Sequence, residues 1–115
     1  MNTVRLIVYS VADVPKAKAF FTTLLGTEPY VEGKPYVGFK AGDFEIGLVP
    51  KRGDGGPPAA LAYVDIPDIK ASLASLTAAG AELVQDVTDV GYGLLIAIVK
   101  NPEGTPVGLR QLPAT

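Results

Sequence analysis

The stretch Lys100-Asn101-Pro102-Glu103-Gly104-Thr105-Pro106-Val107-Gly108-Leu109-Arg110-Gln111 is typical of a tight turn followed by a strand. Pro102 presets φ for the first central position of the turn, and Gly104 supplies the freedom that a positive φ requires. Val107 and Leu109 alternate with their neighbours and therefore share one face of a sheet. Gly108 needs an explanation, because a glycine inside a strand loses packing and costs backbone entropy.

A second glycine in the same context indicates an internal repeat. Ile46-Gly47-Leu48 matches Val107-Gly108-Leu109. Four earlier positions, Leu6, Asp13, Gly26 and Glu28, correspond to Leu61, Asp68, Gly80 and Glu82 at offsets of 55, 55, 54 and 54. The pattern predicts two βαβββ units. The simpler alternatives are two short βαβ segments that are alike by pattern alone, and a ferredoxin-like sandwich, which needs fewer strands than this chain offers.

Each half carries signals for one helix and four strands. An Asp N-cap and a closing Gly delimit the two helices, which we expect between Asp13 and Gly26 and between Asp68 and Gly80. The strands are expected at 4–11, 30–31, 36–41, 44–49, 60–66, 82–87, 94–99 and 107–112. The chain is expected to be one domain of residues 1–115, with a first module over about 1–52, a linker over about 51–58 that could equally be a surface loop, and a second module over about 59–115.

Composition excludes several kinds of chemistry. The 115 residues include no Cys and no His, which removes thiol nucleophiles, imidazole acid–base catalysis and the usual ligands of zinc, copper and iron. Only a carboxylate site for magnesium, calcium or manganese remains open. The net charge of −2 gives no footprint for nucleic acid or an anionic membrane. Without an apolar run of about 18 residues or a signal peptide, a cytoplasmic location is the default expectation.

The motifs in this order resemble the vicinal oxygen chelate superfamily, the group of glyoxalases, bleomycin-resistance proteins and extradiol dioxygenases. The resemblance covers essentially the whole chain. The residues that carry it are Val11-Ala12-Asp13, Phe20-Phe21-Thr22-Thr23-Leu24-Leu25-Gly26, Ile66-Pro67-Asp68, Leu76-Thr77-Ala78-Ala79-Gly80-Ala81 and Asn101-Pro102-Glu103-Gly104-Thr105-Pro106-Val107. Asn101 and Thr105 depart from the group's Asp-Pro-x-Gly-Asn turn. The resemblance implies an α+β fold in which two tandem βαβββ modules form a cupped mixed sheet with the helices outside.

The same resemblance implies that the metal ligands are lost. Metalloenzymes of the group place His and Glu ligands at four positions, which fall here on Leu6, Gly47, Leu61 and Gly108. None of these residues has a side chain that binds a metal. We therefore expect no metal and no cofactor, and no glyoxalase or dioxygenase reaction that needs a metal as Lewis acid or oxygen activator.

Strand alternation from those four positions predicts a small-molecule site inside the cup. Helix-facing neighbours are expected at Ile7, Tyr9, Val11, Ala62, Val64 and Ile66. The expected ligand-binding residues are Leu6, Val8, Ser10, Glu45, Gly47, Leu61, Tyr63, Asp65, Tyr92, Gly108 and Arg110.

The polar members of this set have alternative roles. Glu45 or Asp65 would serve as a general base if burial raised its pKa, or would be an exposed carboxylate at a strand end. Arg110 would pair with one of them, hold a ligand carboxylate or phosphate, or extend to water at the rim.

The tyrosines are equally open. Tyr36, Tyr63 and Tyr92 would stack on a planar ligand or pack in the core. The turn Asp89-Val90-Gly91-Tyr92-Gly93 would cover the cup or simply join two strands.

We expect a metal-independent protein that binds an apolar or aromatic small molecule, of the glyoxalase/bleomycin-resistance type. One alternative is a metal-free isomerase or lyase with candidate catalytic residues Glu45, Asp65 and Arg110. Another is a regulatory or partner-binding domain with a vestigial cup. Exposed strand edges favour a homodimer, and neither nucleic acid nor membrane is an expected partner.

Overall fold

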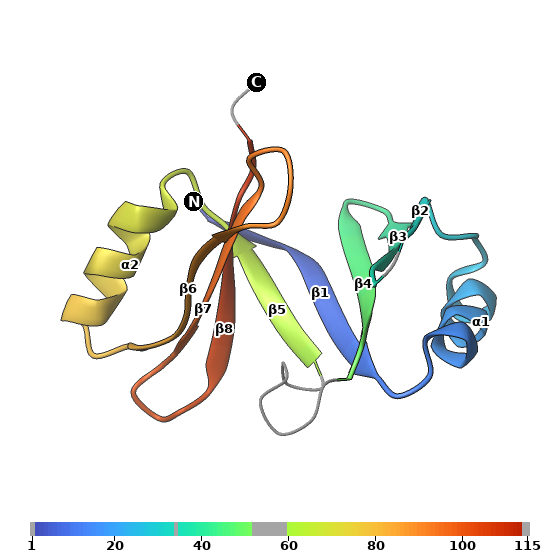
Figure 1. The fold of residues 1–115 in the computed structure, drawn as a ribbon, viewed down its shortest axis with the longest axis horizontal. Coiled ribbons are helices and arrows are strands. Elements are labelled where there is room, and N and C mark those ends of the chain that lie inside the picture. Colours follow the sequence, from blue (N-terminus) through green and yellow to red (C-terminus); the bar gives the residue numbers. More distant parts are fainter. Residues whose placement is uncertain (1, 34, 52–59, 114–115) are drawn as a thin grey trace. The chain divides into compact units, whose positions relative to one another are not determined.

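The computed structural model describes residues 2–33, 35–51 and 60–113. Figure 1 shows the elements, which follow the order β1 (Thr3–Val11), α1 (Val14–Leu25), β2 (Val31–Glu32), β3 (Val37–Ala41), β4 (Phe44–Pro50), β5 (Ala60–Asp65), α2 (Ile69–Ala78), β6 (Glu82–Asp89), β7 (Leu95–Lys100) and β8 (Pro106–Gln111). Of the expected linker, only Lys51 lies in the described part; its N–H donates to the Val11 carbonyl at 2.8 Å. No helix in the described ranges is long and apolar enough to cross a membrane.

The chain divides into two compact units, Arg5–Leu61 and Ala62–Thr115 with Met1–Val4, here called the first and second modules. The first module has the strand order β2-β3-β4-β1, and the second repeats it as β6-β7-β8-β5. In both, the first strand pairs in parallel with the last, β1 with β4 and β5 with β8, and the other pairings are antiparallel. The predicted βαβββ repeat and the α+β class are confirmed.

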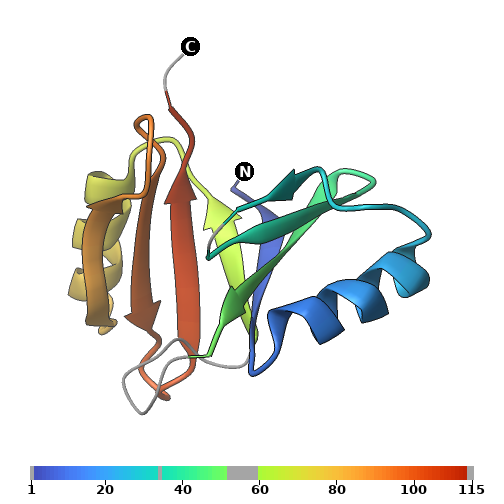
Figure 2. The same cartoon turned by 45° about the vertical axis from the view of Figure 1, so that its right-hand side comes forward.

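One face of the first module's sheet packs against α1 (Figure 2). Phe39 and Leu48 are fully buried there, and Phe21 of the helix lies 6.2 Å from the Phe39 ring, centroid to centroid. Tyr9 completes the aromatic group at 5.3 Å from Phe21. The partly buried residues around this core are Tyr9, Val14, Ala17, Phe21, Leu25 and Ile46.

The second module repeats this packing with smaller side chains. Ile69 at the start of α2 is fully buried against Ala97 and Leu109. The Gln111 side chain accepts a hydrogen bond from the Ile69 N–H at 2.7 Å, which ties the first turn of α2 to the last strand. Tyr9, Val64 and Ile66, three of the residues expected to face the helices, belong to the two cores. Ala62 does not, and is exposed.

Both helices begin and end at the residues that the sequence indicates. Asp13 and Asp68 accept hydrogen bonds from the N–H three residues on, at 3.0 and 3.1 Å. Gly26 ends α1 in the left-handed region at φ +71°. α2 is capped by Ala79, and the predicted Gly80 follows it at φ +104°. The Ala81 N–H bonds to the Leu76 carbonyl at 2.9 Å, which completes a Schellman turn.

Each of the eight predicted strands differs from the observed one by one or two residues at an end, and three of these ends have a physical explanation. Ile66 lies outside β5, since the chain turns there toward the Asp68 cap, and Leu112 lies outside β8, just before Pro113. β6 runs on to Asp89, two residues beyond its expected end. Irregularities between Leu83 and Gln85 and between Gln85 and Thr88 interrupt the strand's alternation, which is the signal that the prediction used.

The turn before β8 is built around the Asn101 side chain. Its Oδ1 accepts hydrogen bonds from the N–H groups of Glu103 and Thr105, at 2.9 and 3.0 Å. The Asn101 N–H in turn donates to the Thr105 carbonyl, and Gly104 takes φ +91°. Asn101 therefore provides the oxygen acceptor that the turn requires, although it departs from the resembled motif.

Asn101→Ala should lower the free energy of unfolding by about 1 kcal/mol, because two N–H groups lose their acceptor. Asn101→Asp, which keeps an oxygen acceptor at this position, should have a free energy of unfolding close to that of the natural protein. Urea denaturation measures both. Equal stabilities for the Ala and Asp variants would contradict this role of Asn101.

Candidate functional site

The predicted site residues of the first module lie on the sheet face that α1 leaves uncovered. Ile46 and Leu48 pack against the α1 side, so Glu45 and Gly47 point away from it. In the β1–β4 pairing Gly47 lies opposite Val8, and in the β3–β4 pairing it lies opposite Gly38. This face therefore carries two facing glycines.

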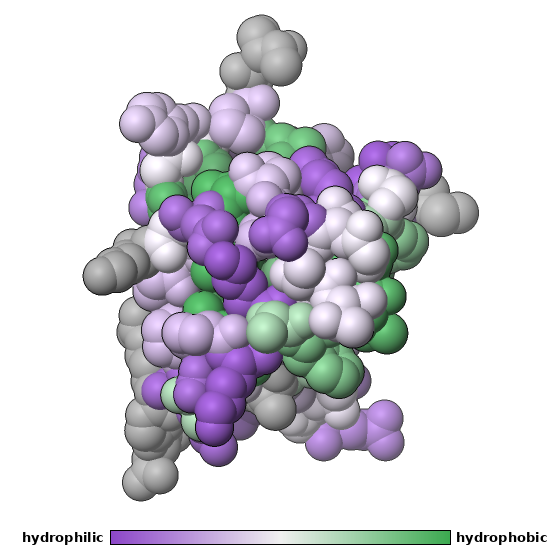
Figure 3. All heavy atoms as spheres, turned by 90° about the vertical axis from the view of Figure 1, so that its right-hand side faces the viewer, coloured by the Kyte–Doolittle hydropathy of each residue, from purple (hydrophilic) through white to green (hydrophobic). Residues whose placement is uncertain are grey.

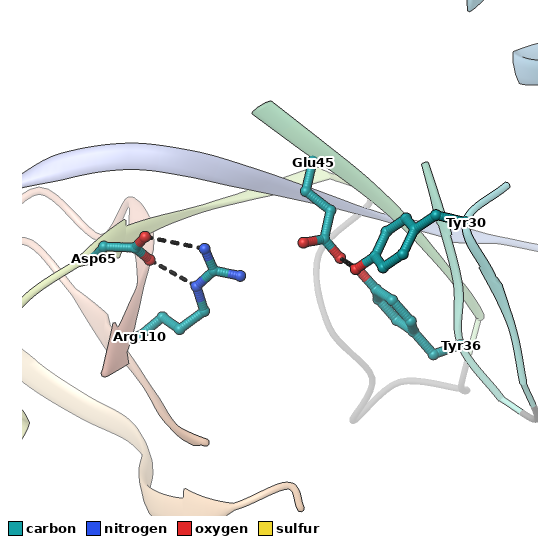
Figure 4. A network of polar contacts seen from close by, with 5 residues as sticks. All are labelled: Tyr30, Tyr36, Glu45, Asp65 and Arg110. Atoms are coloured by element: carbon teal, nitrogen blue, oxygen red, sulfur yellow. Dashed lines mark hydrogen bonds and ion pairs between the residues drawn. The ribbon is translucent and has the colours of Figure 1, made fainter. Parts of the chain in front are cut away.

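A carboxylate and two phenols form the polar group of this face. Tyr36 Oη donates to Glu45 Oε2 at 2.7 Å, and Tyr30 Oη donates to the same oxygen. Figure 4 shows the two rings converging on Glu45 from the segments before β3 and β2. Lys40 lies 4.6 Å from the centre of the Tyr30 ring as a cation–π contact. Glu45 is partly buried rather than the exposed carboxylate that the sequence left open.

The Tyr36 ring explains the glycine in β4. A Cβ added to Gly47 would lie 2.5 Å from Tyr36 Oη, closer than real Cβ contacts allow. A Cβ on Gly38 would lie 2.9 Å from Tyr36 Cε2. β3 and β4 therefore have glycine at positions 38 and 47, because the Tyr36 ring lies flat in the space that a side chain there would occupy.

The second module covers its glycine in a different way. Tyr63 lies opposite Gly108 in the β5–β8 pairing, and a Cβ on Gly108 would lie 2.5 Å from Tyr63 Cδ2. The Tyr63 side chain is buried, with the residue 7% exposed. Burial raises the pKa of the Tyr63 hydroxyl, so it remains a neutral donor throughout the physiological range.

Asp65 and Arg110 form a two-pronged ion pair beside this ring. Arg110 Nε donates to Asp65 Oδ1 at 2.6 Å and Nη2 to Oδ2 at 3.0 Å, as Figure 4 shows. Of the alternatives for Arg110, the structure shows the pairing with Asp65 and not an extension to water, because Arg110 is 8% exposed. The Asp65 side chain is 15% exposed, so it is not the exposed carboxylate at a strand end that the sequence left open. The fork of Arg110 matches the carboxylate plane, which accounts for the burial of both charges.

Other predicted residues are apolar or stand apart. Leu6 and Leu61 are buried at 7% and 2% exposure. Val8 and Ser10 are partly buried, and Ser10 Oγ has no hydrogen-bond partner in the described part of the chain. Tyr92 is fully exposed in the turn between β6 and β7, at φ +54°, and the structure does not bring it to Tyr63 or Arg110.

The residues at the expected metal positions do not fit a metal ion. Leu6, Gly47, Leu61 and Gly108 offer no donor atom, and tyrosine rings lie over both glycines. Within residues 2–33, 35–51 and 60–113, no three acidic, histidine or cysteine side chains gather into a set that would hold one.

One surface hollow of the second module lies on the helix side of its sheet rather than over Tyr63. Its lining comes from α2, β6 and β7: Lys70, Leu73, Asp86, Val87, Asp89 and Leu95. Leu73, Val87 and Leu95 also pack on the α2 core.

Sequence reasoning did not include Tyr30 in the site. Tyr30 precedes β2, and strand alternation does not specify the direction of a side chain there. Alternation along β3 and β4, Tyr36-x-Gly38-x-Lys40 beside Glu45-x-Gly47, places an aromatic residue next to two glycines on one face. That signal indicates Tyr36 but not Tyr30.

The family model described as Glyoxalase/Bleomycin resistance protein/Dioxygenase superfamily matches residues 3–109. The chain therefore belongs to the glyoxalase/bleomycin resistance protein/dioxygenase superfamily, and its α+β fold is the glyoxalase-like fold. No curated protein matches the sequence.

Solved structures share this fold at low sequence identity. A hypothetical protein from Bacillus halodurans C-125 aligns with 99% of this chain and 96% of its own, at a TM-score of 0.79 and 11% identity. A superfamily member from Vibrio splendidus 12B01 has a TM-score of 0.71 at 17% identity, over 96% and 98% of the two chains. Methylmalonyl-CoA epimerase from Mycobacterium tuberculosis has a TM-score of 0.70 at 16% identity, over 98% and 89%.

Gly108→Ala should lower the free energy of unfolding by about 1–3 kcal/mol, because the new Cβ overlaps the Tyr63 ring. In a Tyr63→Leu background the same substitution should cost clearly less, since the flat ring is gone. A double-mutant cycle by urea denaturation measures the coupling. An equal cost in both backgrounds would rule out the proposed contact.

Tyr63 should make stability fall at alkaline pH. Its pKa is raised above the ordinary value of 10.0 by burial. The folded state holds the proton more tightly, so the stabilisation is complete below pH 10 and is lost as pH rises through the folded-state pKa. Denaturation from pH 8 to 11 should show a smaller loss for Tyr63→Phe. Tyr92→Phe, which changes a fully exposed ring, should lose as much stability between pH 8 and 11 as the natural protein does. An equal loss in Tyr63→Phe would refute the prediction.

Proposed function

We propose that this chain is a metal-independent member of the superfamily that binds an apolar or aromatic small molecule on the sheet faces opposite its helices. The observation that carries the proposal is that tyrosine rings lie over Gly47 and Gly108. These two glycines occupy the positions at which the resemblance implies metal-binding carboxylates. The partly buried Tyr36 ring offers a flat surface suited to stacking, and the donors that a metal requires are missing from those positions.

Polar groups beside the rings would orient such a ligand. Glu45 is held by Tyr36, and Asp65 is held by Arg110, so each carboxylate has a fixed position. A few fixed polar groups within an apolar surface are typical of small-molecule sites.

The alternative of a metal-free isomerase or lyase is favoured by one observation. The Glu45 carboxylate accepts hydrogen bonds from the hydroxyls of Tyr30 and Tyr36, so one carboxylate and two O–H donors lie together. A base and an adjacent O–H donor are the parts that proton transfer next to a carbonyl requires. Turnover of a bound ligand, lost in Glu45→Gln while binding remains, would favour this reading.

A thermal-shift screen of aromatic metabolites and antibiotics tests the proposal. A ligand should raise the melting temperature by an amount that follows RT ln(1 + [L]/Kd), equally in EDTA and with added Mn²⁺, Ni²⁺ or Zn²⁺. Tyr36→Leu should weaken the binding of a ligand that stacks on the first module by up to about tenfold.

The matched control is Phe44→Leu, which removes an aromatic ring from the helix-side face of β4 and should leave affinity unchanged. Stoichiometric metal in the purified protein, or ligand binding only in its presence, would overturn the metal-independent reading. Screening without any shift would overturn the binding reading.

A further inference from the structure

A lysine ammonium lies over the ring of Tyr30. Lys40 Nζ is 4.6 Å from the centre of that ring, which is the geometry of a cation–π contact. Tyr30 is 50% exposed, and Lys40 is exposed as well. The contact therefore lies at the surface of the first module, where a cation from solution can take the place of the lysine.

The Tyr30 ring is held in position by groups other than Lys40. The Tyr30 N–H donates to the Gly38 carbonyl at 2.9 Å, and the Tyr30 hydroxyl donates to Glu45 Oε2. The Tyr36 hydroxyl bonds to the same oxygen, and Figure 4 shows the two rings converging there. A Cβ on Gly38 would lie 2.9 Å from both rings, so both lie against the backbone of β3. A ring fixed in this way loses little entropy when a ligand binds.

The hydrogen bond to Glu45 also strengthens the attraction of the Tyr30 ring for a cation. A phenol that donates to a carboxylate gains electron density, so the face of its ring becomes more negative. Such a face attracts cations and repels anions. The position that Lys40 occupies is therefore selective for positive charge.

We propose that the ligand of this sheet face is an organic cation with an alkylated ammonium group, which displaces Lys40 from the Tyr30 ring. The inference rests on the proposed function, because it names the charge of the ligand that we expect on the same face. The primary ammonium of a lysine is strongly hydrated. An alkylated ammonium has less water to lose and is a group that aromatic sites recognise well. The apolar part of the ligand would lie against the tyrosine rings.

The second module presents its ring and its carboxylate differently. Tyr63, the ring over its strand glycine, is 7% exposed. Asp65 accepts two hydrogen bonds from Arg110. A ligand cation would have to displace a buried guanidinium there, whereas on Tyr30 it displaces an exposed lysine. The inference is therefore restricted to the first module.

Lys40→Ala tests the displacement, with choline as the probe. The uncharged control ligand is dimethylbutanol, an alcohol of the same shape in which carbon replaces the charged nitrogen. NMR measures both, because methyl groups that lie over an aromatic ring shift upfield. Choline should bind the natural protein, and Lys40→Ala should tighten its binding by about two- to fivefold, since the competing ammonium is gone. The alcohol should bind more weakly than choline, with an affinity that Lys40→Ala leaves unchanged.

Lys16→Ala is the matched control, because it removes the same charge from another exposed lysine of the first module. It should leave choline binding unchanged. If Lys40 instead held a ligand anion, Lys40→Ala would have the opposite effect. Weaker choline binding in Lys40→Ala, or binding of benzoate that this variant loses, would overturn the inference.

Tyr30→Leu tests the ring itself and should abolish the upfield shift of choline. Phe20→Leu, which removes a ring that is 61% exposed on α1, should leave that shift unchanged. Figure 3, which faces the side where Figure 1 draws α1, shows an apolar area among polar groups. The pair of variants therefore separates recognition on Tyr30 from adhesion to any exposed apolar surface. An equal effect of both would overturn the inference. Lys40→Ala keeps both tyrosines, so the competition test stands even if Tyr30→Leu fails to fold.

The outcomes separate this inference from the proposed function. Equal binding of choline and dimethylbutanol would overturn the selectivity for cations, while an uncharged ligand would still bind the sheet face. Absence of choline binding in both the natural protein and Lys40→Ala would also overturn it. The proposed function is then judged by the uncharged aromatic ligands of the thermal-shift screen.

Discussion

The contact between a tyrosine ring and a strand glycine is the constraint on which both candidate site faces depend. A glycine inside a strand would normally weaken the sheet, since it has no side chain to pack. Here the ring replaces the missing packing, and the glycine in turn is the only residue that lets the ring lie flat. Each partner accounts for the other. Tyr63 provides the ring from the neighbouring strand, and Tyr36 provides it from the segment before β3.

This pairing also decides what chemistry the faces offer. A ring laid over the backbone presents an apolar plane, with its hydroxyl at one edge. The polar groups then come from neighbours on the same face, as with Glu45 under the hydroxyl of Tyr36. Asp65 and Arg110 neutralise each other through two hydrogen bonds, which allows both charges to stay inside. The result is an apolar surface with a small number of fixed polar atoms.

Most of the fold could be predicted from the sequence because its signals are local. Asp13 and Asp68 before apolar helical runs, Gly26 and Gly80 after them, and the repeated strand glycine specified both modules. The contacts of the candidate site were harder to predict from the sequence. That Arg110 is buried depends on Asp65 lying beside it across two strands that are 45 residues apart. Tyr30 reaches Glu45 from a segment without a regular period, so neither alternation nor spacing could indicate it.

The order of strands within each module has a consequence for how the chain folds. β4 lies between β3 and β1, and β8 lies between β7 and β5, so the last strand made in each module fills an inner place. Until it is synthesised, the opening strand of the module has no parallel partner from that module. The first sheet closes only when residue 50 is available, and the second only when residue 111 is. Parallel closure between the ends of each module raises contact order, which slows folding. A nascent chain therefore carries an open sheet for most of the time that each half is being made.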